Sequence, residues 1–318
     1  MSNIIIGIHG LGNKPDAFTL ESWWRSSLLE GTQKRRETDL KMPFEMVYWA
    51  HLLHSVPLHP DISDPEDPLY IEDPYVPGMG DDTSDKPSEL RKKILHYLGH
   101  QLENIFLKKD LTINFSSVND FVIKHFFKDL AMYYDTFHED HTTSDLDMKR
   151  AVRDQLANTL IKNRKKKILL IAHSMGAIIA YDVLTQLASE VEIDTLVTIG
   201  CPLGVPIIRS KIAAEHKNGD AGFTLRTPEN VLKRWYNLSD LRDKIAIYYQ
   251  LSEEFESNSH NVSVIDMIVS NGYQFKGEKN PHKSYGYLKT PELAEIIDNF
   301  LRKEPFAPLV WIKKLFGK

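Results

Sequence analysis

One segment limits the possible folds of this chain more than any other: ILLIAHSMGAIIAYDVL, residues 168–184. It has the pattern of a buried β-strand up to Ala172, a three-residue turn, and an apolar helix that begins at about Gly176. A strand made of continuous apolar residues is typical of a parallel sheet covered on both faces. We therefore expect an α/β protein in which Ser174 lies in a sharp turn at the carboxyl end of a central strand.

The rest of the chain repeats this alternation of strand and helix. Further strands are predicted at Ile4–His9, Met46–Trp49 and Thr195–Gly200, and weaker ones at Arg234–Leu238 and Val262–Ser270, the last of which could equally be a helix. Helices are predicted at Leu20–Leu29, Asp145–Ile161, Ala177–Leu187 and Pro291–Leu301, the last with Thr290 as its N-cap. Such alternation predicts an α/β sandwich with a mainly parallel sheet and right-handed crossovers.

Residues 51–144 interrupt the alternation, because these roughly ninety residues are too many for a simple connection between a strand and a helix. Residues 57–87 are rich in Pro and Asp and predict irregular, extended chain. Two amphipathic helices are predicted after them, at Ser88–Leu107 and Val118–His138. We interpret residues 51–144 as a largely helical cap inserted into a core formed by residues 1–50 and 145–303. The aromatic face of the second cap helix either packs in the core or lines a site for an apolar acyl group.

Composition and charge are those of a soluble globular protein. Of the 318 residues, 42% are hydrophobic and 26% charged, and the net charge is -5, with acidic and basic residues mixed, so no nucleic-acid partner is expected. Cys201 is the single cysteine, which excludes an intramolecular disulfide. Without a signal-like or membrane-spanning segment, we expect a cytoplasmic protein. The amphipathic tail, residues 304–318, mixes Lys with large apolar residues and either docks on the domain or makes peripheral contact with a membrane.

The turn around Ser174 fits the pattern G-x-S-x-G with Ala172 in place of the first glycine. The residues two before and two after the serine must be small because strand and helix approach closely there. The helix N-terminus then directs backbone N–H groups toward a developing oxyanion. The alternative is a serine that only caps the helix. Strand and helix on either side favour a nucleophile.

The loop after the first strand, HGLGNKP, is expected to supply a second backbone N–H donor to the same site. We expect the backbone N–H groups of Leu11 and Met175 to form the oxyanion hole. The loop lacks the G-K-[ST] of a Walker loop and the G-x-G-x-x-G of a Rossmann loop. The acidic residues of the insertion lack the spacing of a calcium loop. No cofactor and no metal are therefore expected.

The remaining partners of a catalytic triad are predicted in the order serine, acid, histidine. Asp240 and Asp243 both follow a strand candidate; we favour Asp243 as the acid and Asp240 as a turn former. His282 lies in a polar loop just before the last helix and is the predicted general base. His173 is expected to pack beneath the serine turn, and Cys201 to be a buried, unreactive thiol.

These motifs together resemble the lipase/esterase group of the α/β-hydrolase superfamily, which includes deacylases acting on lipid-linked substrates. The resemblance rests on AHSMG, the HG loop, D-x-I after the acid and H-x-x-Y before the last helix, and it does not extend to the cap. It implies a serine hydrolase that cleaves a small-molecule or lipid-like carboxylic ester through an acyl-enzyme formed by Ser174, His282 and Asp243. An acyltransferase or thioesterase with the same triad, or a non-catalytic binding protein of this fold, remains an alternative.

Overall fold

A computed structural model describes residues 1–33, 42–78, 143–187, 190–216 and 224–302. Its centre is a six-stranded sheet in the order β2-β1-β3-β4-β5-β6, in which every neighbouring pair is parallel. The strands are β1 Asn3–Ile8, β2 Phe44–Val47, β3 Lys167–His173, β4 Ile193–Ile199, β5 Val231–Ser239 and β6 Val264–Ile268. The predicted α/β fold is confirmed, and the segment that could have been a helix is the edge strand β6.

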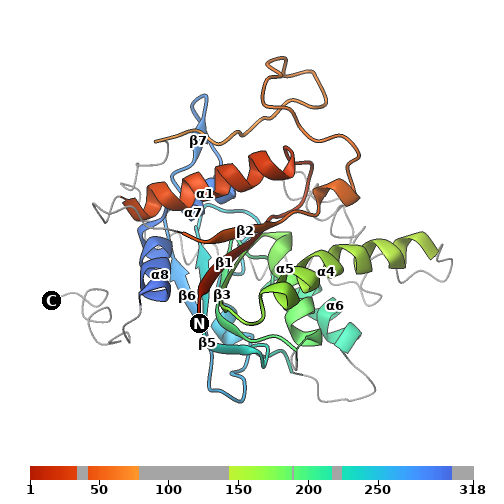
Figure 1. Cartoon of the computed structure of the whole chain (residues 1–318), viewed down its shortest axis with the longest axis vertical. Coiled ribbons are helices and arrows are strands. Elements are labelled where there is room, and N and C mark those ends of the chain that lie inside the picture. Colours follow the sequence, from red (N-terminus) through yellow and green to blue (C-terminus); the bar gives the residue numbers. More distant parts are fainter. Residues whose placement is uncertain (34–41, 79–142, 188–189, 217–223, 303–318) are drawn as a thin grey trace.

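Helices cover both faces of this sheet (Figure 1). On one face lie α4 Thr143–Asn163, α5 Met175–Gln186 and α6 Pro206–His216, and on the other lie α1 Ala17–Gln33, α7 Ser284–Leu288 and α8 Pro291–Leu301. The Thr290 hydroxyl caps α8 by accepting the Leu293 N–H, as predicted. The helices α6 and α7 were not predicted. The five residues of α7 are too few to show a helical period.

Alternate residues of each buried strand face the two helical layers, since side chains alternate across a strand. In β1, Ile4, Ile6 and Ile8 pack toward α4–α6, whereas Ile5 packs toward α1 and α8. All four are buried. Two-sided burial of this kind explains why the strands have continuous apolar sequences without polar alternation.

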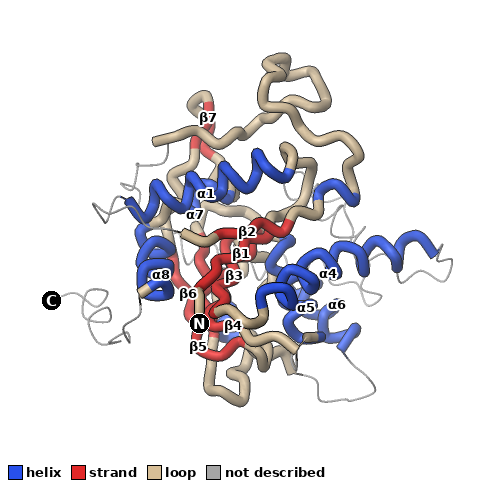
Figure 2. The backbone as a smooth tube through the Cα atoms, in the orientation of Figure 1, coloured by secondary structure: helices blue, strands red, loops and turns tan. Residues whose placement is uncertain are grey.

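The first part of the insertion, residues 51–78, is irregular chain after a short 3-10 turn at Ala50–Leu52, in keeping with its composition. Figure 2 shows it passing over α1 as a loop. The Gly78 N–H donates to Glu30 of α1 at 3.1 Å, and the Tyr273 hydroxyl donates to the Pro74 carbonyl at 2.7 Å. These contacts hold the segment against the core. The two predicted cap helices and the tail, residues 304–318, lie outside the described residues.

In the described part of the chain, no helix combines the length and the apolar composition needed to cross a membrane.

The strand order changes direction at β1. The chain goes from β1 to β2 on one side and then returns to β3 on the other, after which β4, β5 and β6 follow in order. In open parallel sheets, ligands bind at such a switch point, outside the carboxyl ends of the strands. The loops that follow β1 and β3, which contain Leu11 and Ser174, meet at this edge.

Candidate active site

Ser174 occupies a strained turn between β3 and α5. Its backbone angles are φ 52° and ψ −123°, a conformation that L-residues rarely adopt and that costs about 1–3 kcal/mol. A Cβ on Gly176 would lie 2.7 Å from the His9 carbonyl oxygen, and one on Gly10 would lie 2.8 Å from the Ser174 Cβ. These glycines let the β1 loop and the serine turn approach so closely. The strain and the close approach match a turn built to present a side chain.

The structure brings Ser174, His282 and Asp243 into one hydrogen-bonded chain. The Ser174 hydroxyl donates to His282 Nε2 at 3.0 Å. The other ring nitrogen, Nδ1, donates to the Asp243 carboxylate, at 3.0 Å from Oδ1 and 2.9 Å from Oδ2. Because a carboxylate only accepts, the neutral ring carries its proton on Nδ1 and leaves Nε2 free to accept from the serine. This is the arrangement that activates a nucleophile.

Asp243, and not Asp240, contacts the histidine. The Asp243 carboxylate also accepts the Ile245 N–H at 2.9 Å and the Tyr287 hydroxyl at 2.8 Å. Asp240 is bound by Arg242, at 2.9 Å from its Nε, and accepts the Asn271 N–H at 2.6 Å. The bonds from Ile245 and Tyr287 hold the Asp243 carboxylate so that it faces His282. The bonds from Arg242 and Asn271 show that Asp240 stabilises the turn.

Tyr287 is a residue of the site that sequence reasoning missed. Its buried hydroxyl accepts the Asp240 N–H at 3.0 Å, so the phenol proton is directed at Asp243. Burial, and secondarily the negative charge of Asp243, raise the pKa of Tyr287 well above its usual value. The phenol therefore stays a donor. The H-x-x-Y motif of the sequence ends at Tyr285, two residues before Tyr287, and therefore does not point to Tyr287.

The loop that carries His282 is held from several sides. His173 Nε2 donates to the His282 carbonyl oxygen at 2.8 Å, which places His173 beneath the loop. Burial lowers the pKa of His173 well below its usual value. Asn280 accepts the His282 N–H at 3.1 Å and donates to Asp73 of the insertion at 2.7 Å. Asn271 donates to the carbonyls of Pro281 and Lys283, both at 2.8 Å. The backbone on both sides of the imidazole is thus fixed.

The predicted oxyanion donors lie next to Ser174. Met175 is the first residue of α5, where backbone N–H groups have no acceptor within the helix. Leu11 lines the same cavity as Ser174. Its loop is closed by the Lys14 ammonium, which donates to the carbonyls of Leu11 and Gly12, the latter at 3.0 Å. Both predicted donors thus lie close to Ser174, one in the loop after β1 and one at the N-terminus of α5.

Cys201 is 1% exposed, and it does not line the cavity that contains Ser174. Burial raises the pKa of its thiol to about 12, so the thiol stays protonated at neutral pH. It has the character of a packed side chain.

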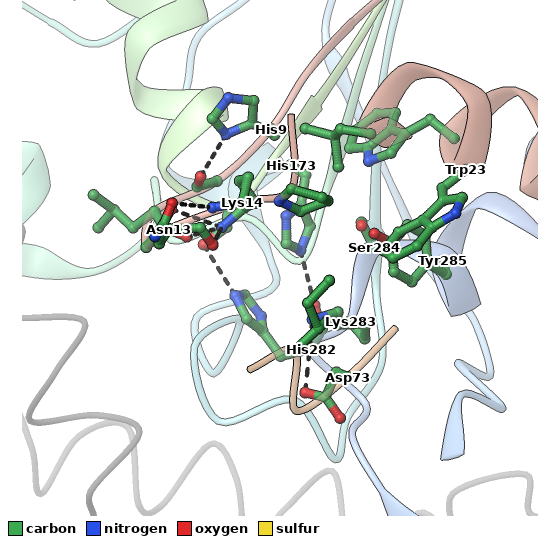
Figure 3. Close-up of a pocket in the computed structure, with 18 of the residues that line it drawn as sticks. His9, Asn13, Lys14, Trp23, Asp73, His173, His282, Lys283, Ser284 and Tyr285 are labelled. Atoms are coloured by element: carbon green, nitrogen blue, oxygen red, sulfur yellow. Dashed lines mark hydrogen bonds and ion pairs between the residues drawn. The ribbon is translucent and has the colours of Figure 1, made fainter. Parts of the chain in front are cut away.

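Figure 3 shows the cavity beside Ser174, with His173 and His282 near Lys14, and Trp23 and Tyr285 grouped farther away. The Asp73 carboxylate lies 3.7 Å from the Lys283 ammonium, which ties the insertion to the histidine loop. The cavity has a volume of about 360 Å³, within the range of small-molecule sites of about 300–1,000 Å³. The arrangement has room for a small group beside the Ser174 hydroxyl, which is hydrogen-bonded to His282.

Comparison with known proteins gives a family for this chain. The family model described as a PGAP1-like alpha/beta domain matches residues 92–274, a span that includes Ser174 and Asp243 but ends before His282. No curated protein matches the chain. Because the family model covers more than half of the 318 residues, the chain belongs to the PGAP1-like alpha/beta domain family, with the fold of the α/β-hydrolase superfamily.

Proposed function

We propose that this protein is a serine hydrolase that cleaves a carboxylic ester through an acyl-enzyme. The observation that supports this most is the unbroken chain of hydrogen bonds from the Ser174 hydroxyl through His282 to Asp243, with distances of 2.9–3.0 Å. The serine at the start of these hydrogen bonds lies at the switch point of a parallel sheet, and the fold is shared with hydrolases. A merely structural serine would need neither the strained backbone nor the oriented histidine.

The proposed reaction follows from this geometry. Ser174 Oγ attacks the ester carbonyl while its proton passes to His282 Nε2, and Asp243 stabilises the imidazolium that forms. The Leu11 and Met175 N–H groups bind the tetrahedral oxyanion. His282 then gives the proton to the leaving alkoxide as the carbon–oxygen bond breaks. A water molecule, deprotonated by His282, attacks the acyl-enzyme. As the bond to Ser174 Oγ breaks, His282 returns the proton to Oγ, and the carboxylic acid is released.

Covalent labelling tests the proposal directly. A fluorophosphonate should react with the protein as Ser174 Oγ displaces fluoride from phosphorus, and mass spectrometry should locate the adduct on the peptide that contains Ser174. His282→Ala should slow the labelling by at least a hundredfold, because the general base contributes about 10²–10⁴-fold. An exposed histidine outside the cavity, His260, provides the matched control, His260→Ala. Labelling at another residue, or equal rates in both variants, would contradict the proposed mechanism.

A further inference from the structure

The cavity beside Ser174 has an apolar wall. On the serine side lie the backbone of the β1 loop and the His282 loop. The cavity is also lined by the large side chains of Leu20, Trp23, Leu58, Ile71, Ile245 and Tyr285. Among these, Trp23 and Tyr285 lie together, away from Lys14 and His282 (Figure 3). A reactive serine therefore opens onto a surface that favours hydrocarbon, because burial of apolar groups is the main source of affinity in such sites.

This wall is built from residues with defined contacts. Trp23 of α1 packs edge-on against Tyr285, with ring centroids 6.0 Å apart. Leu58 belongs to the insertion, and its N–H donates to the Lys14 carbonyl at 2.9 Å, next to the oxyanion loop. Ile71, also from the insertion, is 7% exposed. Two residues of the insertion thus form part of the site.

A comparison with a second cavity indicates which part of an ester the first cavity would bind. Its volume is about 630 Å³, and it borders His282 and Asp243 but not Ser174. More charged side chains line it than line the first cavity, among them Glu72, Arg242, Lys244, Lys276, Glu278 and Lys279. During ester cleavage, the acyl group stays bonded to Ser174, whereas the leaving alcohol takes its proton from His282. The apolar cavity that contains Ser174 is therefore the one suited to an acyl group.

We propose that the apolar cavity binds the acyl chain of the ester and that Leu58 forms part of the wall that contacts this chain. This rests on the proposed ester hydrolysis. A cavity of about 150 Å³ holds a benzene ring, so a volume of about 360 Å³ has room for a chain of roughly six to twelve carbons. The substrate class is accordingly an ester of a medium-chain fatty acid or of an acid of similar size.

The test compares p-nitrophenyl acetate, butyrate, hexanoate and octanoate. In the wild type, kcat/KM should rise about fourfold for each added methylene up to hexanoate, the factor expected for burying a methylene group. Leu58→Trp fills the cavity and should lower the octanoate-to-acetate ratio of kcat/KM at least tenfold. Val56→Trp is the matched control, since Val56 lies two residues away, is 53% exposed and does not line the cavity. Its ratio should equal that of the wild type.

The outcomes separate this proposal from the proposed function. If fluorophosphonate labels Ser174 while Leu58→Trp keeps the wild-type profile, the acyl assignment is overturned and the hydrolase stands. If the wild type is not labelled, the hydrolase itself fails. If Leu58→Trp instead changes the preference within a series of alkyl acetates, the cavity holds the alcohol. Should Leu58→Trp fail to fold, Ile71→Ala is the second variant. It enlarges the same cavity and should raise the decanoate-to-hexanoate ratio of kcat/KM. An unchanged ratio overturns the proposal.

A different observation concerns His9, which follows β1 and is buried. The Trp49 backbone N–H donates to His9 Nε2 at 3.1 Å, and the Trp49 indole N–H donates to the His9 carbonyl at 3.0 Å. The two rings are stacked, with centroids 4.9 Å apart. Since a backbone N–H can only donate, Nε2 is unprotonated and the ring proton is on Nδ1. Burial, and then the positive charge of Lys14, lower the pKa of His9 to about 3, which keeps the ring neutral near neutral pH.

The ring proton of His9 is directed at the oxyanion loop. Nδ1 donates to the Gly10 carbonyl oxygen at 2.8 Å. That carbonyl and the Leu11 N–H belong to one planar trans peptide and point in opposite directions. A bond that fixes the carbonyl therefore also fixes the direction of the Leu11 N–H. We infer that His9 is a positioning residue that, together with Trp49, orients the Leu11 N–H toward the oxyanion of the proposed reaction.

Substitutions at His9 test this role. His9→Leu keeps the apolar volume but removes the donor, and it should lower kcat about ten- to a hundredfold, less than the 10²–10³-fold cost of deleting an oxyanion donor. KM should change less than threefold. Affinity for an alkyl boronic acid, which forms a tetrahedral adduct on Ser174, should fall by the same factor as kcat. His9→Asn, whose amide can donate near the position of Nδ1, should recover most of both losses.

A purely structural His9 would behave differently. In that case, both variants would lose activity in proportion to their folded fraction, measured by circular dichroism, and boronate affinity per folded molecule would not change. That outcome, or equal losses in His9→Leu and His9→Asn, overturns the inference. If His9→Leu does not fold, Trp49→Phe keeps a stacked ring but removes the indole donor, and should reproduce a smaller loss of kcat and boronate affinity in parallel. Wild-type labelling by fluorophosphonate keeps these results distinct from a failure of the hydrolase.

Discussion

Replacing Ser174 with alanine should lower kcat for a p-nitrophenyl ester on the order of 10⁶-fold, because removing the nucleophile of such a triad disables the whole unit. Some acceleration over water should remain from the oxyanion hole and from substrate binding. The Ser174 side chain is 2% exposed and small, so the variant should keep the wild-type fold. Initial rates over a range of ester concentrations, together with thermal unfolding, measure both effects.

Ser22→Ala is the matched control for this variant, since Ser22 is exposed on α1 and does not line the cavity. It should retain wild-type kcat and KM. Activity of Ser174→Ala within tenfold of the wild type would rule out Ser174 as the nucleophile.

Asp243→Asn should lower kcat on the order of 10⁴-fold, because an amide N–H can force the proton of His282 onto the wrong ring nitrogen. Asp240→Asn should lower kcat less than tenfold, although the two residues are three positions apart. Asp240 does not touch His282; its carboxylate instead accepts from Arg242 and from the Asn271 N–H. In Asp240→Asn, the buried ion pair with Arg242 loses its negative charge, and the free energy of unfolding should therefore fall.

Comparing the two variants separates catalysis from stability. Asp243→Asn should shift kcat far more than the unfolding midpoint, and Asp240→Asn should do the reverse. The opposite ranking in kcat would make Asp240 the catalytic acid and would leave Ser174 and His282 in their proposed roles.

Much of the fold could be predicted from the sequence because its determinants are local. Strands such as β1 and β3 are buried on both faces, so their continuous apolar residues indicate a parallel sheet wherever they occur. The turn around Ser174 needs small residues at two fixed positions, and Ala172 and Gly176 show this directly. The five residues of α7 are too few to show a helical period. The helix α6 has eleven residues, as many as α8, but its apolar residues are separated less clearly onto one face than those of α8.

Only part of the candidate site could be predicted from the sequence. Ser174, Asp243 and His282 were all named from motifs and chain order, and the structure brings the three together. The choice between Asp240 and Asp243 depended on which carboxylate meets a residue about forty positions later. The local D-x-I pattern favoured Asp243, but the contact with His282 that distinguishes the two carboxylates is made only in the folded chain.

What the sequence by itself determined is therefore the parallel sheet, the strained serine turn and the order of the three side chains, since each depends on residue type within a few positions. Only the tertiary structure decided which acid faces His282, how Tyr287 and His9 orient their neighbours, and that Leu58 and Ile71 of the insertion line the cavity. These contacts join distant segments, and the physical reason is the same for each. A hydrogen bond or an apolar wall depends on where the fold places two groups, not on their spacing along the chain.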